Sequence, residues 1–158
     1  MNNVKHVNLP LASHFKLSFV LSPRTDQEKK YMSHVPFEKF ICDLMYVMVS
    51  TRPETSHAVG VISRFMAHPS EEHWRVVKWV LRYLRGTSDY CIIFNGNEGL
   101  VCRYVDADYV GDLDKRRSTI GYVFTLAGGA ISWMSKLQET VVLSITSPCS
   151  LDVSSTPC

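Results

Sequence analysis

Four aspartates lie within nine residues of this sequence, and carboxylates at that density either bind a metal ion or line a solvated turn. They are Asp106, Asp108, Asp112 and Asp114. A calcium loop of the EF-hand type that began at Asp106 would need a glutamate eleven residues later, where the chain has Arg117. The spacing alone therefore favours an Asp-rich turn around Gly111.

A basic stripe precedes these aspartates. Its cations recur at steps of three, four and three, and they are Arg75, Lys78, Arg82 and Arg85. On a helix this spacing puts them on one face, flanked by Trp79 and Tyr83. Such a stripe is either a solvated face or a surface that follows nucleic-acid phosphates beside aromatic rings.

Three sequence blocks around the aspartates resemble the start of the ribonuclease H domain in the Pol polyprotein of copia-type LTR retrotransposons. They cover residues 104–112 (YVDADYVGD), 117–124 (RSTIGYVF) and 128–138 (GGAISWMSKLQ). Residues 51–54 (TRPE), 58–66 (AVGVISRFM) and 72–87 (EHWRVVKWVLRYLRGT) resemble the family's helical connection between polymerase and ribonuclease H. That position, similar to a reverse transcriptase thumb, implies a weak RNA/DNA hybrid-binding role for the basic stripe.

Ribonuclease H chemistry, which the resemblance implies, uses carboxylates to hold two Mg²⁺ ions about 4 Å apart. Asp106 takes the place of the family's first-strand metal ligand, and Asp108 matches an aspartate that we do not expect to be catalytic. Cys149 stands where the family has its next ligand, a glutamate, and a thiol is a poor ligand for Mg²⁺. Two further family aspartates fall beyond this sequence. We therefore expect Asp106 to be a vestigial partial metal site, with no intact catalytic set and no tightly bound Mg²⁺.

The hydrophobic spacing predicts three helices, near residues 36–49, 53–67 and 70–85. A capping box of Thr51 and Glu54 should begin the second helix, and Ser70 should cap the third. The side chains expected to pack these helices together are Leu44, Ile62, Phe65, Val77, Leu81 and Leu84. Short strands are expected at 90–94, 100–105, 119–126 and 130–134. The fold class is thus α+β: a three-helix thumb-like segment followed by a truncated ribonuclease H-like antiparallel β-sheet.

The expected organisation has four regions. Residues 1–34 form an extended lead-in after a missing polymerase palm, 35–88 the helical segment, 89–146 a partial ribonuclease H-like domain, and 147–158 a disordered, divergent tail. The resemblance stops near residue 146, as a frameshift, a deletion or a misjudged exon would cause. Without the family's later elements, an apolar sheet face around Tyr122, Phe124 and Trp133 would be open to self-association.

Composition limits the partners and the compartment. The 158 residues carry a formal charge of only +2, so a nucleic-acid surface has to be a local patch. Five cysteines without a C-x-x-C pair argue against a zinc site and a disulfide framework, and they indicate a reducing, intracellular compartment. The N-terminus lacks the apolar core of a signal peptide, and no stretch is long enough to span a membrane, so we expect neither secretion nor insertion.

Three functions fit these patterns. The first is a catalytically inactive retrotransposon remnant with weak nucleic-acid binding. The second is an active ribonuclease H-type endonuclease that uses Asp106, Asp108 and Asp112 while a partner chain supplies the other carboxylates. The third is an effector-like protein, because residues 82–85 (RYLR) spell the R-x-L-R motif of secreted oomycete effectors. That motif, however, falls inside an amphipathic helix in mid-chain.

Overall fold

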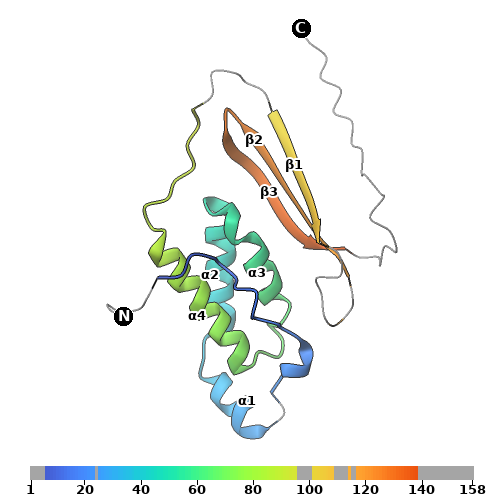
Figure 1. Ribbon diagram of the computed structural model, residues 1–158. Helices are drawn as coiled ribbons and strands as arrows, with labels where there is room; N and C mark the ends of the chain where they lie inside the picture. The colour runs from blue at the N-terminus through green and yellow to red at the C-terminus, as the bar shows by residue number, and fades with distance from the viewer. Residues whose placement is uncertain (1–5, 24, 96–100, 109–113, 115–116, 139–158) are drawn as a thin grey trace.

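A helical unit and a three-stranded sheet lie side by side in the computed structural model of the chain (Figure 1). The structure describes residues 6–23, 25–95, 101–108, 114 and 117–138. Its elements are η1 (Phe19–Leu21), α1 (Asp26–Ser33), α2 (Phe37–Ser50), η2 (Pro53–Thr55), α3 (Ser56–Ser63), α4 (Glu71–Gly86), β1 (Val101–Asp108), β2 (Thr119–Leu126) and β3 (Gly129–Leu137). The fold is therefore α+β, as the sequence predicts. No helix in these ranges is both long and apolar enough to cross a membrane.

The expectation of an extended lead-in over residues 1–34 is wrong for residues 26–33, which form α1. Thr25 begins this helix with a capping box: its side chain accepts from the Glu28 amide, and the Glu28 carboxylate accepts from the Thr25 amide, both at 3.4 Å. The helix exposes most of its side chains, and only Met32 is buried. Such a short helix with one apolar contact gives little hydrophobic periodicity, so its capping box was its main sequence signal.

The capping box expected at Thr51 and Glu54 is also wrong. Thr51 ends α2 instead, and Arg52 precedes η2 with no side-chain cap. The Glu54 carboxylate lies 3.6 Å from the Arg52 guanidinium, so it pairs with a cation rather than with a first-turn amide. The helix expected over 53–67 is consequently a 3₁₀ turn followed by α3, which ends at Ser63.

The core lies among the helices. Buried apolar side chains come from the N-terminal segment, from all four α-helices and from the connection between α3 and α4, and they are Leu17, Met32, Phe37, Ile41, Leu44, Ala58, Val59, Ile62, Phe65, Val76, Val77, Val80 and Tyr83. Leu81 and Leu84, expected in this core, are only half-buried at its edge. The buried face of α4 is therefore centred on Val76, Val77 and Val80.

The sheet is antiparallel with the order β1-β2-β3. β2 has the predicted bounds, whereas residues 90–94 form no strand. Ala127 and Gly128 connect β2 to β3 with φ angles of 49° and 80°. This left-handed pair is the backbone that a two-residue hairpin turn requires.

The register corrects the expected apolar face. Val123 pairs with Trp133, whereas Tyr122 pairs with Met134. Because successive side chains of a strand point to opposite faces, Trp133 lies on the other face from Tyr122 and Phe124. The Trp133 face packs on the helices, where Trp133 Nε1 donates to the Met48 carbonyl oxygen at 2.9 Å.

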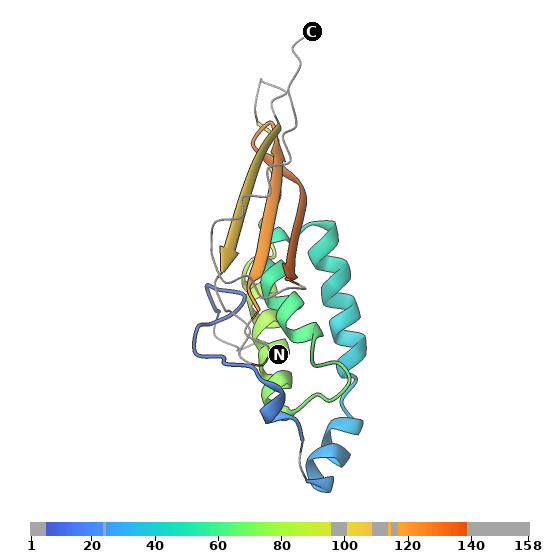
Figure 2. The same ribbon diagram turned by 90° about the vertical axis from the view of Figure 1, so that its right-hand side faces the viewer.

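The sheet approaches the helical unit through β3, as Figures 1 and 2 show. A Cβ at Gly60 would lie 3.4 Å from the Ser135 carbonyl oxygen, so α3 and the β3 backbone lie in close contact at this position. Together with the Trp133 hydrogen bond to Met48, this contact positions the sheet.

Candidate nucleic-acid interface

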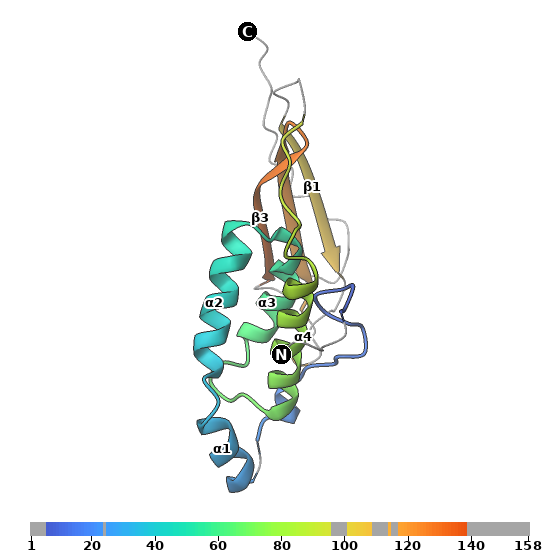
Figure 3. The ribbon, with the colours of Figure 1, turned by 90° about the vertical axis from the view of Figure 1, so that its left-hand side faces the viewer.

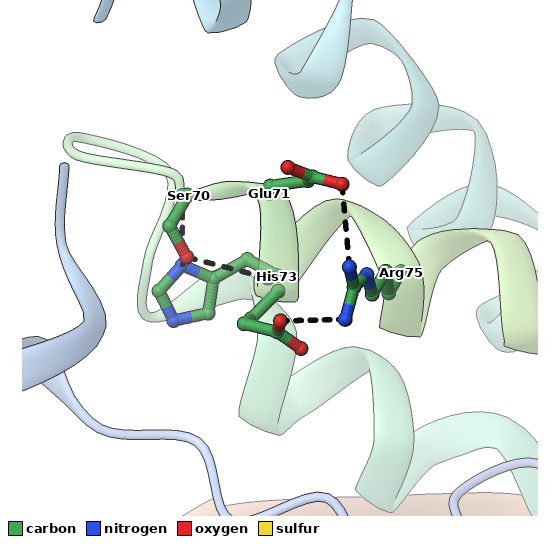
Figure 4. Close-up of polar contacts among 5 residues, drawn as sticks. Ser70, Glu71, His73 and Arg75 are labelled. Carbon is green, nitrogen blue, oxygen red and sulfur yellow. Dashed lines mark hydrogen bonds and ion pairs between the residues drawn. The ribbon is translucent and has the colours of Figure 1, made fainter. Parts of the chain in front are cut away.

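Helix α4 carries the candidate site, and a capping box fixes its start (Figure 4). Ser70 Oγ accepts from the His73 amide, and the Ser70 amide donates to His73 Nδ1 at 2.9 Å. Ser70 is thus the cap that the sequence predicts. The third residue after Ser70 is His73, where a capping box ordinarily has a glutamate. For this reason the sequence predicted the Ser70 cap but not the reciprocal hydrogen bond from the Ser70 amide.

His73 is fully buried, and its ring stacks on Phe65 with 4.1 Å between centroids. Burial lowers the pKa of His73 to about 4, against the opposing charge of Asp114. The imidazole is therefore neutral at pH 7. Because Nδ1 accepts from the Ser70 amide, we place the proton on Nε2, which has no hydrogen-bond partner among the described residues.

The basic stripe begins two residues after His73, at Arg75, but its four cations are not equivalent. Arg75 Nη1 lies 2.7 Å from Glu72 Oε1, and its Nη2 lies 3.4 Å from Glu71 Oε1 (Figure 4). Its charge is thus compensated by the first turn of its own helix. Lys78 instead lies over the Trp74 ring, 5.9 Å from the centroid.

Arg82 lies over the ring of Trp79, with 4.7 Å between its guanidinium carbon and the ring centroid. It forms no ion pair with any residue that the structure describes, and its Nε is buried without a hydrogen-bond partner there. The Trp79 ring is itself fixed: its Nε1 donates to the Leu9 carbonyl oxygen at 2.9 Å, and Phe15 meets it edge-on at 5.4 Å. The N-terminal segment that supplies these contacts lies beside α4 in Figures 1 and 3.

These groups surround a hollow of about 500 Å³, which we call the α4 hollow. It is lined by Phe15, Arg75, Lys78, Trp79, Leu81, Arg82 and Arg85. All four cations of the predicted stripe therefore meet at one site. Tyr83 does not flank it, because its side chain is only 6% exposed and belongs to the core. Phe15 was missed, since it comes from a segment more than sixty residues earlier.

Asp106 and Asp114, the two of these aspartates whose side chains the structure describes, do not meet at one site. Asp106 lies on β1 opposite Gly121, and it lines a smaller hollow of about 290 Å³ together with His57, Tyr104 and Ser135. Asp106 is the only carboxylate among the described residues that line it. Within the described ranges, no three His, Cys, Asp or Glu residues come together as metal ligands would. These residues do not fit a two-Mg²⁺ site. The Asp108 side chain, Asp112 and Cys149 lie outside the described residues.

Asp114 has a role that the sequence did not indicate. Its carboxylate accepts from the Ser18 hydroxyl and, at 2.9 Å, from the Phe19 amide. The Phe19 ring in turn packs on Phe65, with 4.8 Å between centroids. One of the four aspartates thus ties the N-terminal segment to the connection between β1 and β2.

Comparison with known proteins places these features in a family. The chain is 53% identical over 146 residues to the retrovirus-related Pol polyprotein from transposon TNT 1-94 of Nicotiana tabacum, which covers 92% of this chain and 11% of that protein. It is 38% identical to the Pol polyprotein from transposon RE1 of Arabidopsis thaliana, over 92% of this chain and 10% of that protein. The chain thus spans about a tenth of these polyproteins.

A shorter relative is matched over most of its length. The secreted RxLR effector protein 161 of Plasmopara viticola is 49% identical over 117 residues, which cover 73% of this chain and 82% of that protein. No family model matches the chain. No solved structure matches it either.

Proposed function

Because this chain belongs to the Pol polyprotein family of copia-type retrotransposons, we propose that it is a retrotransposon-derived protein that binds nucleic acid through α4 and does not hydrolyse it. The observation that carries this proposal is the α4 hollow, where the four cations of the basic stripe meet aromatic side chains. Phosphate binding by such a patch is sequence-independent and weakens steeply with salt, because bound cations release counterions from the nucleic acid.

The cations should contribute unequally. Glu71 and Glu72 compensate Arg75, and a phosphate would have to compete with both carboxylates. Lys78 and Arg82 lie over indole rings and pair with no carboxylate in the described part of the chain. Lys78 and Arg82 should therefore supply most of the affinity for an RNA/DNA hybrid.

Binding can be tested by fluorescence anisotropy with a labelled RNA/DNA hybrid at low and moderate salt. Changing Arg75, Lys78, Arg82 and Arg85 together to glutamine should abolish binding, and the Lys78 and Arg82 pair alone should remove most of it. The Arg75→Gln variant is the matched control on the same face. Because Glu71 and Glu72 already compensate the Arg75 charge, this change should weaken binding less than the Lys78 and Arg82 changes. A quadruple variant that binds the hybrid as well as the parent would show that the stripe is only a solvated face.

The proposed lack of hydrolysis rests on the metal ligands that the sequence and the described residues offer. We propose that residues 101–137 correspond to the first strands of a ribonuclease H-like sheet, with Asp106 as the vestige of its first metal ligand. A single carboxylate does not fix two Mg²⁺ ions, because Mg²⁺ dehydrates reluctantly and binds weakly to sparse ligands. The sequence also has Cys149 in place of the family's next glutamate.

Hydrolysis can be tested with a labelled hybrid in Mg²⁺ and in Mn²⁺. We expect no cleavage above background, and Asp106→Asn should leave that background unchanged. Cleavage that disappears in the Asp106→Asn variant would instead support the alternative, an active endonuclease whose partner chain completes the carboxylate set.

An effector-like function is a second candidate, favoured by the similarity to the RxLR protein of Plasmopara viticola. In this chain, however, residues 82–85 form part of α4. Tyr83 is buried in the core, and Arg82 lies on Trp79. A motif recognised as an extended peptide would require this helix to unfold, so we propose that the four residues serve the fold and the α4 hollow.

We also propose an intracellular location. Cys42, Cys91 and Cys102 are exposed free thiols, which a reducing compartment preserves. A fluorescent fusion of the chain should stay inside the producing cell, and recovery of the protein in the culture medium would favour the effector function.

The outer face of the sheet is a candidate for self-association. Tyr122 and Phe124 meet edge-to-face on this side of the sheet with 5.4 Å between ring centroids, and Val105 and Met134 beside them are 55% and 39% exposed. Sedimentation should show a concentration-dependent dimer that a Val105→Lys change weakens. A strict monomer at high concentration would contradict this partner assignment.

A further inference from the structure

The wall of the α4 hollow is mostly apolar, which distinguishes it from a simple phosphate-binding stripe. Phe15, Trp79 and Leu81 supply the apolar surface, and cations on three successive turns of α4 supply the charge. A volume of about 500 Å³ is within the usual range for sites that enclose a small organic group. A ligand that fills this hollow therefore has a flat apolar part as well as negative charge.

A nucleic-acid duplex carries the negative charge but does not expose the flat apolar face of a base. Its bases are stacked in pairs, so a duplex on α4 would contact the cations and leave the apolar wall in water. An unpaired base exposes both of its faces, and proteins bind such bases by stacking them on aromatic rings or on arginine guanidinium planes. The hollow matches the second kind of ligand.

Trp79 and Arg82 provide such a stacking surface before any ligand arrives. Arg82 lies 4.7 Å above the indole ring, while the Leu9 carbonyl oxygen and the edge of Phe15 hold that ring in place. Because Arg82 is positioned by the ring rather than by a carboxylate of the described residues, its charge remains available to a phosphate.

The spread of the cations indicates a strand rather than a free nucleotide. From Arg75 to Arg85 the stripe extends over ten residues, which is about 15 Å of helix. That length is several times the rise of about 3.4 Å per nucleotide along the axis of one stacked DNA strand. One base in the hollow would leave Lys78 and Arg82, which pair with no carboxylate of the described residues, for neighbouring phosphates.

We propose that the α4 hollow binds one unpaired base of a single-stranded nucleic acid, stacked against Trp79 and Arg82, while Lys78 and Arg82 contact the flanking phosphates. This inference rests on the proposed nucleic-acid binding and names the form of nucleic acid that the site prefers.

Three labelled ligands of equal length test it: an oligothymidylate of about eight nucleotides, a size within the range of known single-strand sites, an abasic strand with the same phosphates, and an RNA/DNA hybrid. In low salt the thymidylate should bind about tenfold more tightly than the abasic strand, the size of one base–aromatic stack. The hybrid should bind no more tightly per strand than the abasic strand.

Variants on one helix identify the stacking surface. Trp79→Leu should reduce the thymidylate-to-abasic affinity ratio about tenfold. Arg82→Lys, which keeps the charge but removes the planar guanidinium, should reduce the ratio in the same direction. Trp74→Phe is the matched control, because Trp74 lies on α4 outside the hollow and packs on Phe37 and Phe40. Its ratio should equal that of the parent, with helical circular dichroism confirming that each variant is folded.

The measurements distinguish a failure of the single-strand inference from a failure of the proposed nucleic-acid binding. Equal affinity for thymidylate, abasic strand and hybrid would overturn the single-strand inference and leave phosphate binding by α4 intact. Failure of all three ligands to bind in low salt would overturn both the inference and the proposed function. A ratio that falls in Trp74→Phe but not in Trp79→Leu would also contradict the assignment of the base to this hollow.

Discussion

The helical unit and the sheet are held together by different interactions. Every buried apolar side chain of the described residues lies between Leu17 and Tyr83, within or just before the helices. The strands bury no large apolar side chain among those described, and their regular feature is the backbone ladder from β1 to β3. The helical unit thus has its own hydrophobic core, whereas the sheet depends on the helices that it contacts.

The two candidate sites differ in the same way. The α4 hollow is built on a helix whose inner face is anchored by Val76, Val77 and Val80, so the backbone that carries its cations and rings is held in place. Asp106 lies on an exposed strand with no second carboxylate beside it in the described structure. A functional site needs side chains held in place by packing, and only the helical unit provides that packing here.

The most severe test of this difference is a charge in the core. Val77→Asp should unfold the helical unit, because an unpaired buried carboxylate costs several kcal/mol and Val77 is 0% exposed. Leu81→Asp at the half-buried edge should cost clearly less. Urea unfolding followed by helical circular dichroism measures both, and equal losses would contradict the separation of core from edge.

Acidification should destabilise the helical unit through His73. Its pKa is 6.5 in the unfolded chain and about 4 in the folded protein, so between these values the unfolded chain binds more protons. The contribution of neutral His73 is full above about pH 6.5 and is lost as the pH falls toward 4. The loss is about 3 kcal/mol, since one pKa unit corresponds to about 1.4 kcal/mol.

The matched control for this pH dependence is His73→Gln, which keeps an acceptor for the Ser70 amide but does not titrate. Urea unfolding at pH 7 and pH 4.5 should show a smaller difference in the variant than in the parent. Identical differences would mean that other groups cause the acid sensitivity.

The junction between sheet and helices should respond to a smaller change. Trp133→Phe removes the hydrogen bond to the Met48 carbonyl oxygen, worth about 1 kcal/mol. Amide hydrogen exchange should become faster in β3 while α4 remains protected. Equal acceleration in both would show that the two regions unfold as one unit, which would remove the distinction between them.

The smallest effect is expected on the surface of α4. Arg75→Gln removes exposed ion pairs to Glu71 and Glu72, and such pairs contribute no more than about 0.5 kcal/mol. The melting temperature should barely change. A large decrease would show that the stability of α4 depends on its surface charges as well as on its core.

Local patterns predicted the elements that have strong local signals. The helix near 70–85, its Ser70 cap, the strand at 119–126 and the convergence of the four cations all follow from spacing within one segment. Some errors were local, such as the capping box expected at Thr51 and the strand expected at 90–94, whereas others involve contacts between distant segments. Phe15 reaches Trp79 from the N-terminal segment, and the face taken by Trp133 depends on register and on α2. No local period contains that information.

The bond between Asp114 and Ser18 constrains the order in which the chain can assemble. It joins residues 96 positions apart, and the entropy of closing a loop increases with its length. Contacts among α2, α3 and α4 need far shorter loops, so these helices should associate first. During synthesis, Ser18 leaves the ribosome well before its partner has been made. Leu17 and Phe15 can pack on the helices before then. The hydrogen bond from Ser18 to Asp114, however, forms only after the region beyond β1 has been made, so we expect it to be a late step in folding.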